Sequence, residues 1–289
     1  TESAESIRNL LVVLANPSGD CDDTFMSLLL KAVQEVWDRK ENEALIDDIV
    51  QFMQEAIQQP EYRDTTTVRA RMEEIIVGLD KYCSWGIYGA YFNSKKPSLD
   101  DNVRFSVLEM GALKDKPDLL AAVMFSMMIY VEQRMYLSDR QQPKVCLIDE
   151  AWKLLSKDNK RAEDFIENGY RTARKYNGAY ITITQGIEDF DGQKASGAAK
   201  AAWANSSFKI ILRQNRDAFR KYCLDNPEAF NRFEREVIEG FPAAREAHFS
   251  AFMLRYGGQT SFHRLLLDPI SRVMFSSDGE DFDYREAGL

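Results

Sequence analysis

Apolar residues recur every three or four positions in three successive stretches of the chain, around residues 25–37, 45–57 and 68–79. This spacing places the apolar side chains on one face of a helix and predicts three amphipathic helices. No strand-like pattern separates the three stretches. We therefore expect an all-α subdomain over residues 20–82, whose apolar faces pack against one another as its core.

The pattern changes after residue 82. The stretch 103–109 predicts a strand, the apolar residues of 117–137 predict a long helix, and the short apolar run 145–148 predicts a buried strand. Strand, helix and strand in this order are typical of a βαβ unit, in which the two strands are parallel. This part of the chain is therefore expected to form an α/β core with a mainly parallel sheet.

Helices and strands continue to alternate toward the carboxyl end of the chain. A hairpin is expected around Gly257-Gly258, because two glycines between two strand patterns favour a tight turn. Near the amino end, residues 7–14 suit either a helix or a strand. The other expected elements are helices over 152–176, 194–203, 217–222 and 227–238 and strands over 179–184, 208–212, 251–256 and 261–267.

Two consecutive carboxylates, Asp149 and Glu150, directly follow the buried strand 145–148. An apolar strand that ends in paired acids is typical of a Walker B element. In nucleotide hydrolysis the first acid helps to hold Mg²⁺, and the second orients the attacking water. The same acids would also suit the first turn of a following helix, where negative charge is favoured, so the residues alone leave both interpretations open.

Further polar groups are expected near these acids. Gln185 follows the strand 179–184, and ligands of open α/β sheets bind at the carboxyl ends of strands, so its amide could contact the γ-phosphate or the attacking water. An amide that only fixes the turn is the alternative. Arg171, Arg174 and Lys175 close the preceding helix, where the helix dipole favours cations in any case. As a group they could also reach the phosphates bound to a neighbouring subunit.

Composition narrows the class of protein. The chain of 289 residues is 45% hydrophobic and 29% charged, which suits a large globular domain. Its net charge of −9 and pI near 5.0 argue against a broad electrostatic contact with nucleic acid. Four widely spaced cysteines without a CxxC pair suit a reducing compartment and give no zinc signature. No apolar run reaches the about 20 residues of a membrane-spanning helix, and no signal peptide is recognisable.

Several segments, in the same order, closely resemble the carboxyl-terminal ATPase domain of TraC-type proteins, the assembly ATPases of conjugative type IV secretion systems. The segments are FSVLEMGALKDKPDLLAAVMFSMMIYVEQRM, KVCLIDEAWKLL, GYRTARKYNGAYITITQ and GGQTSFHRLLLDPISRVMFSS. The resemblance covers most of the chain. It implies a RecA-like P-loop NTPase fold, with residues 1–19 and 83–289 as the α/β core and residues 20–82 as an inserted all-α subdomain.

The resemblance also implies a function and a set of site residues. Such proteins form hexamers at the cytoplasmic face of the bacterial inner membrane, bind ATP and Mg²⁺, and power pilus assembly and substrate transfer alongside other components of the secretion channel. Asp149 and Glu150 would be the Walker B pair, with Asp149 on the side of the metal. Gln185 would be the glutamine after the sensor strand. Arg171, Arg174 and Lys175 would be the basic group offered across a subunit boundary.

One motif of the family is absent from the sequence. The family has a phosphate-binding loop, GxxxxGK[ST], before the helical insertion, and residues 1–289 contain no such sequence. Asn16-Pro-Ser-Gly19 is the closest turn, but it lacks the Lys-Ser pair. Because backbone amides and a lysine normally hold the phosphates, we expect this chain alone to bind nucleotide weakly and to be inactive. We also expect that Thr1 lies after the loop in a longer protein, which hydrolyses ATP.

Two other functions fit parts of the sequence. A DNA-pumping motor of the FtsK and HerA class would share the Walker B element and the cation offered in trans, but the acidic balance gives it little support. A docking module without catalysis would use the two acids only to cap a helix. DNA-stimulated hydrolysis would favour the first alternative. Glu150→Gln separates the second from the catalytic interpretations, because an unchanged hydrolysis rate would remove Glu150 from the mechanism.

Overall fold

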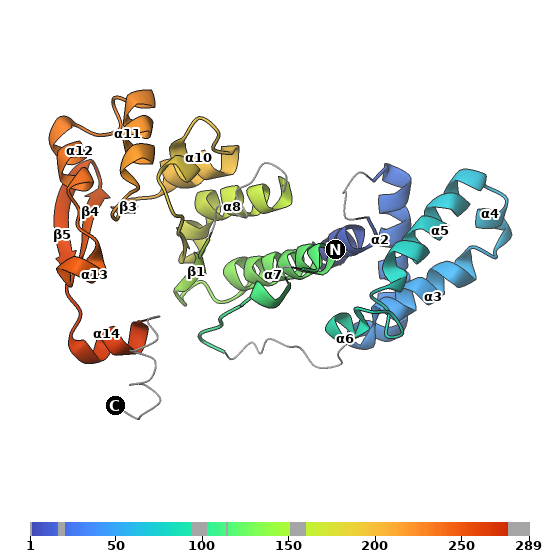
Figure 1. The fold of residues 1–289 in the computed structure, drawn as a ribbon. Coiled ribbons are helices and arrows are strands. Elements are labelled where there is room, and N and C mark those ends of the chain that lie inside the picture. The colour runs from blue at the N-terminus through green and yellow to red at the C-terminus, as the bar shows by residue number, and fades with distance from the viewer. Residues whose placement is uncertain (1, 17–20, 94–102, 114, 151–159, 277–289) are drawn as a thin grey trace. The chain divides into compact units, whose positions relative to one another are not determined.

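The computed structural model describes residues 2–16, 21–93, 103–113, 115–150 and 160–276. The chain divides into two compact units, residues 1–133 and residues 134–289. The described part of the first unit is built from helices, and both sheets belong to the second unit (Figure 1).

Four helices, α1, α2, α3 and α5, pack against one another to form the core of the first unit. The three amphipathic helices predicted within residues 20–82 are confirmed as α2, α3 and α5. The stretch 7–14, which suited either a helix or a strand, is part of α1. The helices are α1 (Glu2–Ala15), α2 (Asp23–Lys40), η1 (Glu41–Glu43), α3 (Ile46–Ala56), α4 (Pro60–Arg63), α5 (Thr66–Asp80) and α6 (Gly89–Phe92).

The sequence of α2 shows why such a helix forms here. Asp22 caps its amino end by accepting the backbone N–H of Phe25 at 2.8 Å. Phe25 and Val36 lie on its buried face. Another contact of this core, between α1 and α5, depends on Gly78, because an added Cβ would lie 2.2 Å from the carbonyl oxygen of Ala15. Glycine at this position lets the two backbones approach closely.

The core of the first unit extends beyond the range predicted for the insertion. Leu14 of α1 is fully buried in it, and so is Tyr82, which follows α5. The division of the family fold into a core of residues 1–19 and 83–289 with an insertion of residues 20–82 stays a prediction.

The strand predicted at 103–109 is wrong. This stretch has no regular secondary structure, and the side chains of Phe105 and Val107 are 83% and 72% exposed. An apolar run forms a strand only where a neighbouring strand offers hydrogen bonds, and no described strand pairs with this stretch. The expected long helix does follow, as α7 (Pro117–Leu137), after the 3-10 helix η2 (Gly111–Leu113).

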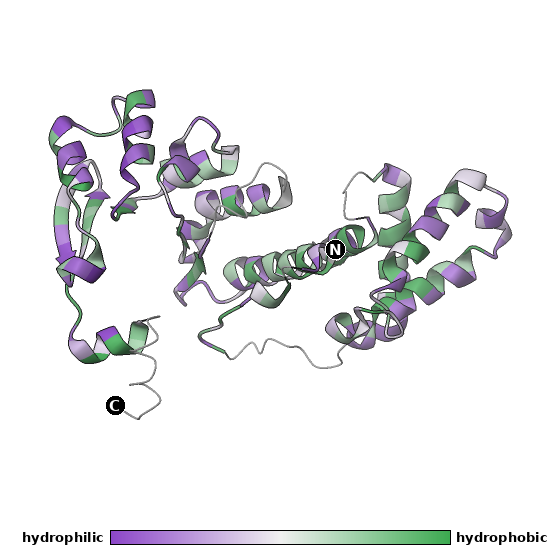
Figure 2. Cartoon of the chain, in the orientation of Figure 1, coloured by the Kyte–Doolittle hydropathy of each residue, from purple (hydrophilic) through white to green (hydrophobic). Residues whose placement is uncertain are grey.

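Helix α7 is largely apolar, as its colouring in Figure 2 shows. Leu119, Met128 and Met135 are among its buried side chains. Unbranched methionine side chains adapt to irregular spaces in a core, in agreement with a packing role. No helix in the described ranges combines the length and the apolar character needed to cross a bilayer.

The second unit contains a parallel pair of strands joined by a helix. β1 (Lys144–Ile148) pairs with β2 (Gly178–Thr182). α8 (Lys160–Thr172) and the 3-10 helix η4 (Ala173–Tyr176) lie between the two strands in the chain. Phe165 of α8 packs edge-on against Tyr180 of β2, with ring centres 5.8 Å apart. The predicted parallel sheet is confirmed, but its strand–helix–strand unit is β1, α8 and β2, because the expected unit of 103–109, 117–137 and 145–148 lacks its first strand.

A second sheet is antiparallel, in the order β3-β4-β5. The predicted hairpin is confirmed, because β4 and β5 meet at Gly257 and Gly258, whose φ angles of 55° and 82° suit a two-residue turn. Its strands are β3 (Phe208–Ile211), β4 (Ser250–Tyr256) and β5 (Gln259–Leu265). The helices of this region are α9 (Glu188–Asp191), α10 (Gly197–Asn205), α11 (Arg216–Asp225), α12 (Arg232–Glu239), α13 (Ala244–Ala247) and α14 (Pro269–Phe275).

Helix α12 begins later than the predicted range 227–238. Asn231 caps it, because its side chain accepts the N–H of Glu234 at 2.9 Å while the Glu234 carboxylate accepts the N–H of Asn231 at 3.0 Å. Glu234 is buried, and it also accepts hydrogen bonds from Arg255 at 3.1 Å and from Thr260 at 2.7 Å. These bonds fasten α12 to the β4–β5 hairpin.

The four cysteines, Cys21, Cys83, Cys146 and Cys223, form no disulfide bond. Burial raises the pKa of Cys83 to about 12 and that of Cys146 to about 11, and it also raises the pKa of Cys223. These three thiols are therefore protonated at neutral pH and are poor nucleophiles.

Candidate functional site

The two parallel strands place predicted site residues at one edge. β1 ends at Ile148, before Asp149 and Glu150, and β2 runs in the same direction toward Gln185. The backbone N–H of Ile183 donates to the carbonyl of Ile148 at 2.9 Å, so the two segments stay side by side past the last ladder pair. The Nε2 atom of Gln185 lies 3.3 Å from Oε1 and 3.4 Å from Oε2 of Glu150. The structure therefore brings this amide and the second acid together.

Glu150 has an uncommon backbone conformation. Its φ angle of 52° lies in the left-handed region, which costs a residue with a Cβ about 1–2 kcal/mol. Asp149 supports the turn, because its Oδ1 atom accepts the backbone N–H of Glu150 at 2.8 Å. Asp149 is exposed, and Glu150 is partly buried. The turn keeps both acids at the end of the strand, and nothing in the sequence pattern indicated its left-handed geometry.

The sequence pattern also gave no role to Asp189 of α9, which lies near the same edge. Partial burial raises the pKa of its carboxyl group, and the negative charges of Glu188 and Glu150 raise it further. The backbone amides of Gly186 and Gln185 act in the opposite direction. The feature of the sequence that could have indicated a role for Asp189 is the pair of carboxylates, Glu188 and Asp189, shortly after Gln185.

The predicted cations lie at the opposite edge of the strands. Arg174 and Lys175 belong to η4, which precedes β2, whereas Gln185 follows it; both cations are exposed. A strand of 5 residues is about 16 Å long, so these cations do not meet the acids of their own chain. Arg171 differs from them, because its guanidinium pairs with Glu167, one turn earlier in α8, at 2.6 Å.

Several bonds fix this amino edge. The Nζ atom of Lys144 donates to the backbone carbonyls of Met135 and Tyr176, at 3.2 Å each, and so binds the last turn of α7 and the end of η4. The Nδ2 atom of Asn177 donates to the carbonyl of Gln141 at 3.1 Å. The segment that carries the two exposed cations is therefore tied to the preceding loop and helix.

The donor atoms at the carboxyl edge suit a magnesium-bound nucleotide. Carboxylate and amide oxygens, as in Asp149, Glu150 and Gln185, are the hard ligands that Mg²⁺ prefers. Within the described ranges, no group of three or more His, Cys, Asp or Glu side chains is arranged to hold a metal ion. A nucleotide-associated Mg²⁺ needs only one or two carboxylates from the protein, because water and phosphates supply its other ligands. Asp149 and Glu150 thus fit a metal that arrives with its nucleotide.

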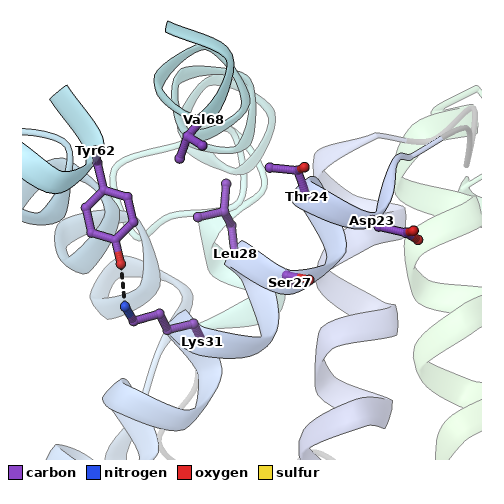
Figure 3. Close-up of a pocket in the computed structure, with 7 residues that line it drawn as sticks. All are labelled: Asp23, Thr24, Ser27, Leu28, Lys31, Tyr62 and Val68. Carbon is purple, nitrogen blue, oxygen red and sulfur yellow. Dashed lines mark hydrogen bonds between the residues drawn. The ribbon is translucent and has the colours of Figure 1, made fainter. Parts of the chain in front are cut away.

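A separate hollow lies in the first unit, where α2, α4 and α5 meet. Its volume is about 370 Å³, and Figure 3 shows Lys31 bonded to the hydroxyl group of Tyr62 at its side. Leu28 and Val68 form apolar parts of its lining. None of the predicted site residues lines this hollow, so it is distinct from the carboxyl edge of the strands.

Comparison with known proteins identifies a family. Residues 1–227 match the model of the TraG P-loop domain. The chain is 50% identical over 292 residues to Protein TraC of Escherichia coli (strain K12), an alignment that covers 100% of this chain and 33% of TraC. The chain therefore spans about a third of the length of this relative.

A solved structure agrees with the fold. The structure of VirB4 of Thermoanaerobacter pseudethanolicus matches with a TM-score of 0.65 and 18% sequence identity, and the match covers 92% of this chain and 69% of VirB4. At this level of identity the likeness concerns the fold alone, and it confirms the predicted RecA-like α/β fold. The resemblance to TraC-type proteins is confirmed by the identity with TraC. Since the family model covers most of the residues, the chain belongs to the TraG P-loop domain family.

Proposed function

We propose that this chain carries the hydrolytic edge of an ATPase of a conjugative type IV secretion system. The contact of Gln185 with Glu150, at the shared carboxyl edge of β1 and β2, is the observation that carries the proposal. Membership of the P-loop family and similarity to TraC support it. The substrate is ATP, and the metal ion is Mg²⁺.

Each polar group at this edge has a role in the proposal. Bound MgATP supplies the phosphoanhydride bond and the metal charge that stabilises the developing negative charge. Asp149 helps to hold the metal through its exposed carboxylate. Glu150 accepts a hydrogen bond from the attacking water and polarises it. Gln185 orients the water and the Glu150 carboxylate through its amide.

The three cations act on a second subunit in this proposal. Because Arg174 and Lys175 lie at the opposite edge from the acids of their own chain, they can stabilise phosphate charge only at a neighbour's site. Arg171 is the weakest candidate of the three, because it is paired with Glu167. Action across subunits requires an assembly, and we propose the hexamer implied by the TraC resemblance.

We further propose that the complete protein works at the cytoplasmic face of the bacterial inner membrane. There it would act with the other components of the secretion channel and power pilus assembly and substrate transfer; the similarity to TraC supports this step. Nucleotide binding by residues 1–289 alone is expected to be weak, and hydrolysis absent, because they contain no GxxxxGK[ST] loop.

Replacing Glu150 by Gln in the complete protein tests the proposal. The substitution keeps the size of the side chain but removes its negative charge, so kcat for ATP should fall about 10²- to 10⁴-fold while the free energy of unfolding changes by less than about 0.5 kcal/mol. Glu228→Gln, at an exposed position of the same unit, is the matched control. An unchanged rate in Glu150→Gln would remove Glu150 from the mechanism, absence of hydrolysis by the wild-type protein would favour a docking module, and stimulation of wild-type hydrolysis by DNA would favour a translocating motor.

A further inference from the structure

Gln185 can act in hydrolysis only if the turn that carries it is held in place. Its side chain is exposed, and fixing a mobile glutamine costs up to about 2 kcal/mol of rotamer entropy. The backbone of the turn 184–187 must therefore direct the amide. Two of its ties are local: Thr184 Oγ1 donates to the carbonyl of Gly186 at 3.1 Å, and the N–H of Asp189 donates to the same carbonyl at 3.3 Å.

A third hydrogen bond to the turn 184–187 comes from a distant part of the chain. The backbone N–H of Ile187 donates to Oε1 of Gln214, at 3.2 Å and across 27 residues of sequence. Gln214 follows β3 of the second sheet. The side chain of Ile187 is buried in a core that includes Phe219 of α11 and Met253 of β4, so the bond lies beside a fixed apolar anchor. Packing and a hydrogen bond thus attach the turn to the second sheet and its helices.

Gln214 is itself held in one orientation. Its Nε2 atom donates to the carbonyl of Leu212 at 3.1 Å, so Oε1 is the atom that accepts from Ile187. The next residue, Asn215, caps α11 and accepts the N–H of Asp217 at 3.1 Å. A strand end on one side and a helix cap on the other restrict the backbone of Gln214.

We propose that Gln214 is a positioning residue for hydrolysis, whose Oε1 atom fixes the turn 184–187 so that the amide of Gln185 meets Glu150. The inference rests on the proposed function and extends it to a residue that follows strand β3 of the second sheet. Gln214 acts through Ile187 and makes no direct contribution to nucleotide binding. Its loss should therefore lower kcat and kcat/KM together and leave KM nearly unchanged.

Gln214→Leu in the complete protein removes both polar atoms at similar side-chain size. We expect kcat for ATP to fall roughly ten- to hundredfold, with KM changed less than about threefold, because small misplacements of orienting groups cost up to about 10²-fold. Hydrogen exchange of the Ile187 amide is a readout independent of activity and should become about tenfold faster. Gln51→Leu, at an exposed position of α3, is the matched control and should change neither quantity.

Gln214→Glu keeps the acceptor oxygen and loses only the bond from Nε2 to the carbonyl of Leu212, so the Ile187 amide should stay largely protected in this variant. This second variant also tests the proposal if Gln214→Leu does not fold. Wild-type kcat with unchanged Ile187 exchange in Gln214→Leu, or fast exchange in Gln214→Glu, would overturn the proposal. A different set of results is expected if the proposed function itself is wrong. In that case Glu150→Gln would keep the wild-type rate, while the exchange of Ile187 would still respond to Gln214→Leu.

Discussion

The amino and carboxyl edges of the β1–β2 pair differ in what their polar residues do. At the amino edge, Lys144 binds two backbone carbonyls and Asn177 binds a third, so these side chains stabilise the fold. At the carboxyl edge, Glu150 has a left-handed backbone, and burial and neighbouring acids raise the pKa of Asp189. Polar residues that reduce stability are typical of sites with a chemical role. The contrast concerns these side chains: Lys144 and Asn177 stabilise the fold at the amino edge, whereas the carboxyl edge carries the acids and the amide of the proposed hydrolytic site.

In the proposed function, the acids and cations that act on one nucleotide come from different subunits, because the two edges of the β1–β2 pair are too far apart within one chain. Mixed assemblies test this proposal. Arg174→Ala should lower kcat of the complete protein about 10³-fold, as expected for a cation that stabilises transferred phosphate. Mixing this variant with Glu150→Gln should restore part of the activity, because some interfaces then combine an intact cation with an intact acid. If the mixtures were no more active than either variant alone, the proposal that acid and cation come from different subunits would be wrong. Arg171→Ala should have a smaller effect, because Arg171 is paired with Glu167.

The structural role of the amino edge predicts a loss of stability without a loss of catalysis. Lys144→Met removes a charged donor from two carbonyls, so the free energy of unfolding should fall by about 2 kcal/mol in urea titrations. The kcat of the folded protein should stay within about twofold of the wild-type value. Lys200→Met, at an exposed position of α10, is the control and should shift stability by less than about 0.5 kcal/mol. A Lys144 variant as stable as this control would remove the assigned structural role.

Replacing Asp189, near the carboxyl edge, is expected to raise the free energy of unfolding slightly. Because the pKa of Asp189 is raised above the ordinary value of 3.8, protonation favours the folded state, and this contribution is lost as the pH rises through the folded pKa. Asp189→Asn should therefore raise the free energy of unfolding at pH 7, by about 0.5 kcal/mol or less for a partly exposed group. The gain should vanish near pH 3, where the wild-type carboxyl group is protonated. Urea midpoints at the two pH values measure it, and a less stable Asn variant at pH 7 would contradict the sign.

Local patterns predicted the three longer helices within residues 20–82, because an amphipathic helix has one apolar face, but they left residues 7–14 open between a helix and a strand. The stretch 103–109 was also apolar, but a strand depends on a partner that its own residues do not specify. The contact of Gln185 with Glu150 was predictable, since parallel strands bring their carboxyl ends to the same edge. The role of Gln214 was not predictable, because its hydrogen bond with Ile187 joins residues that are 27 positions apart in the sequence.

The raised pKa values of three thiols have a practical consequence for labelling. Little thiolate exists at Cys83, Cys146 and Cys223 at neutral pH, because burial raises the pKa of each. A maleimide dye should therefore react first at Cys21, just ahead of α2. A fluorophore attached there would follow the helical unit during turnover while every residue of the carboxyl edge stays native.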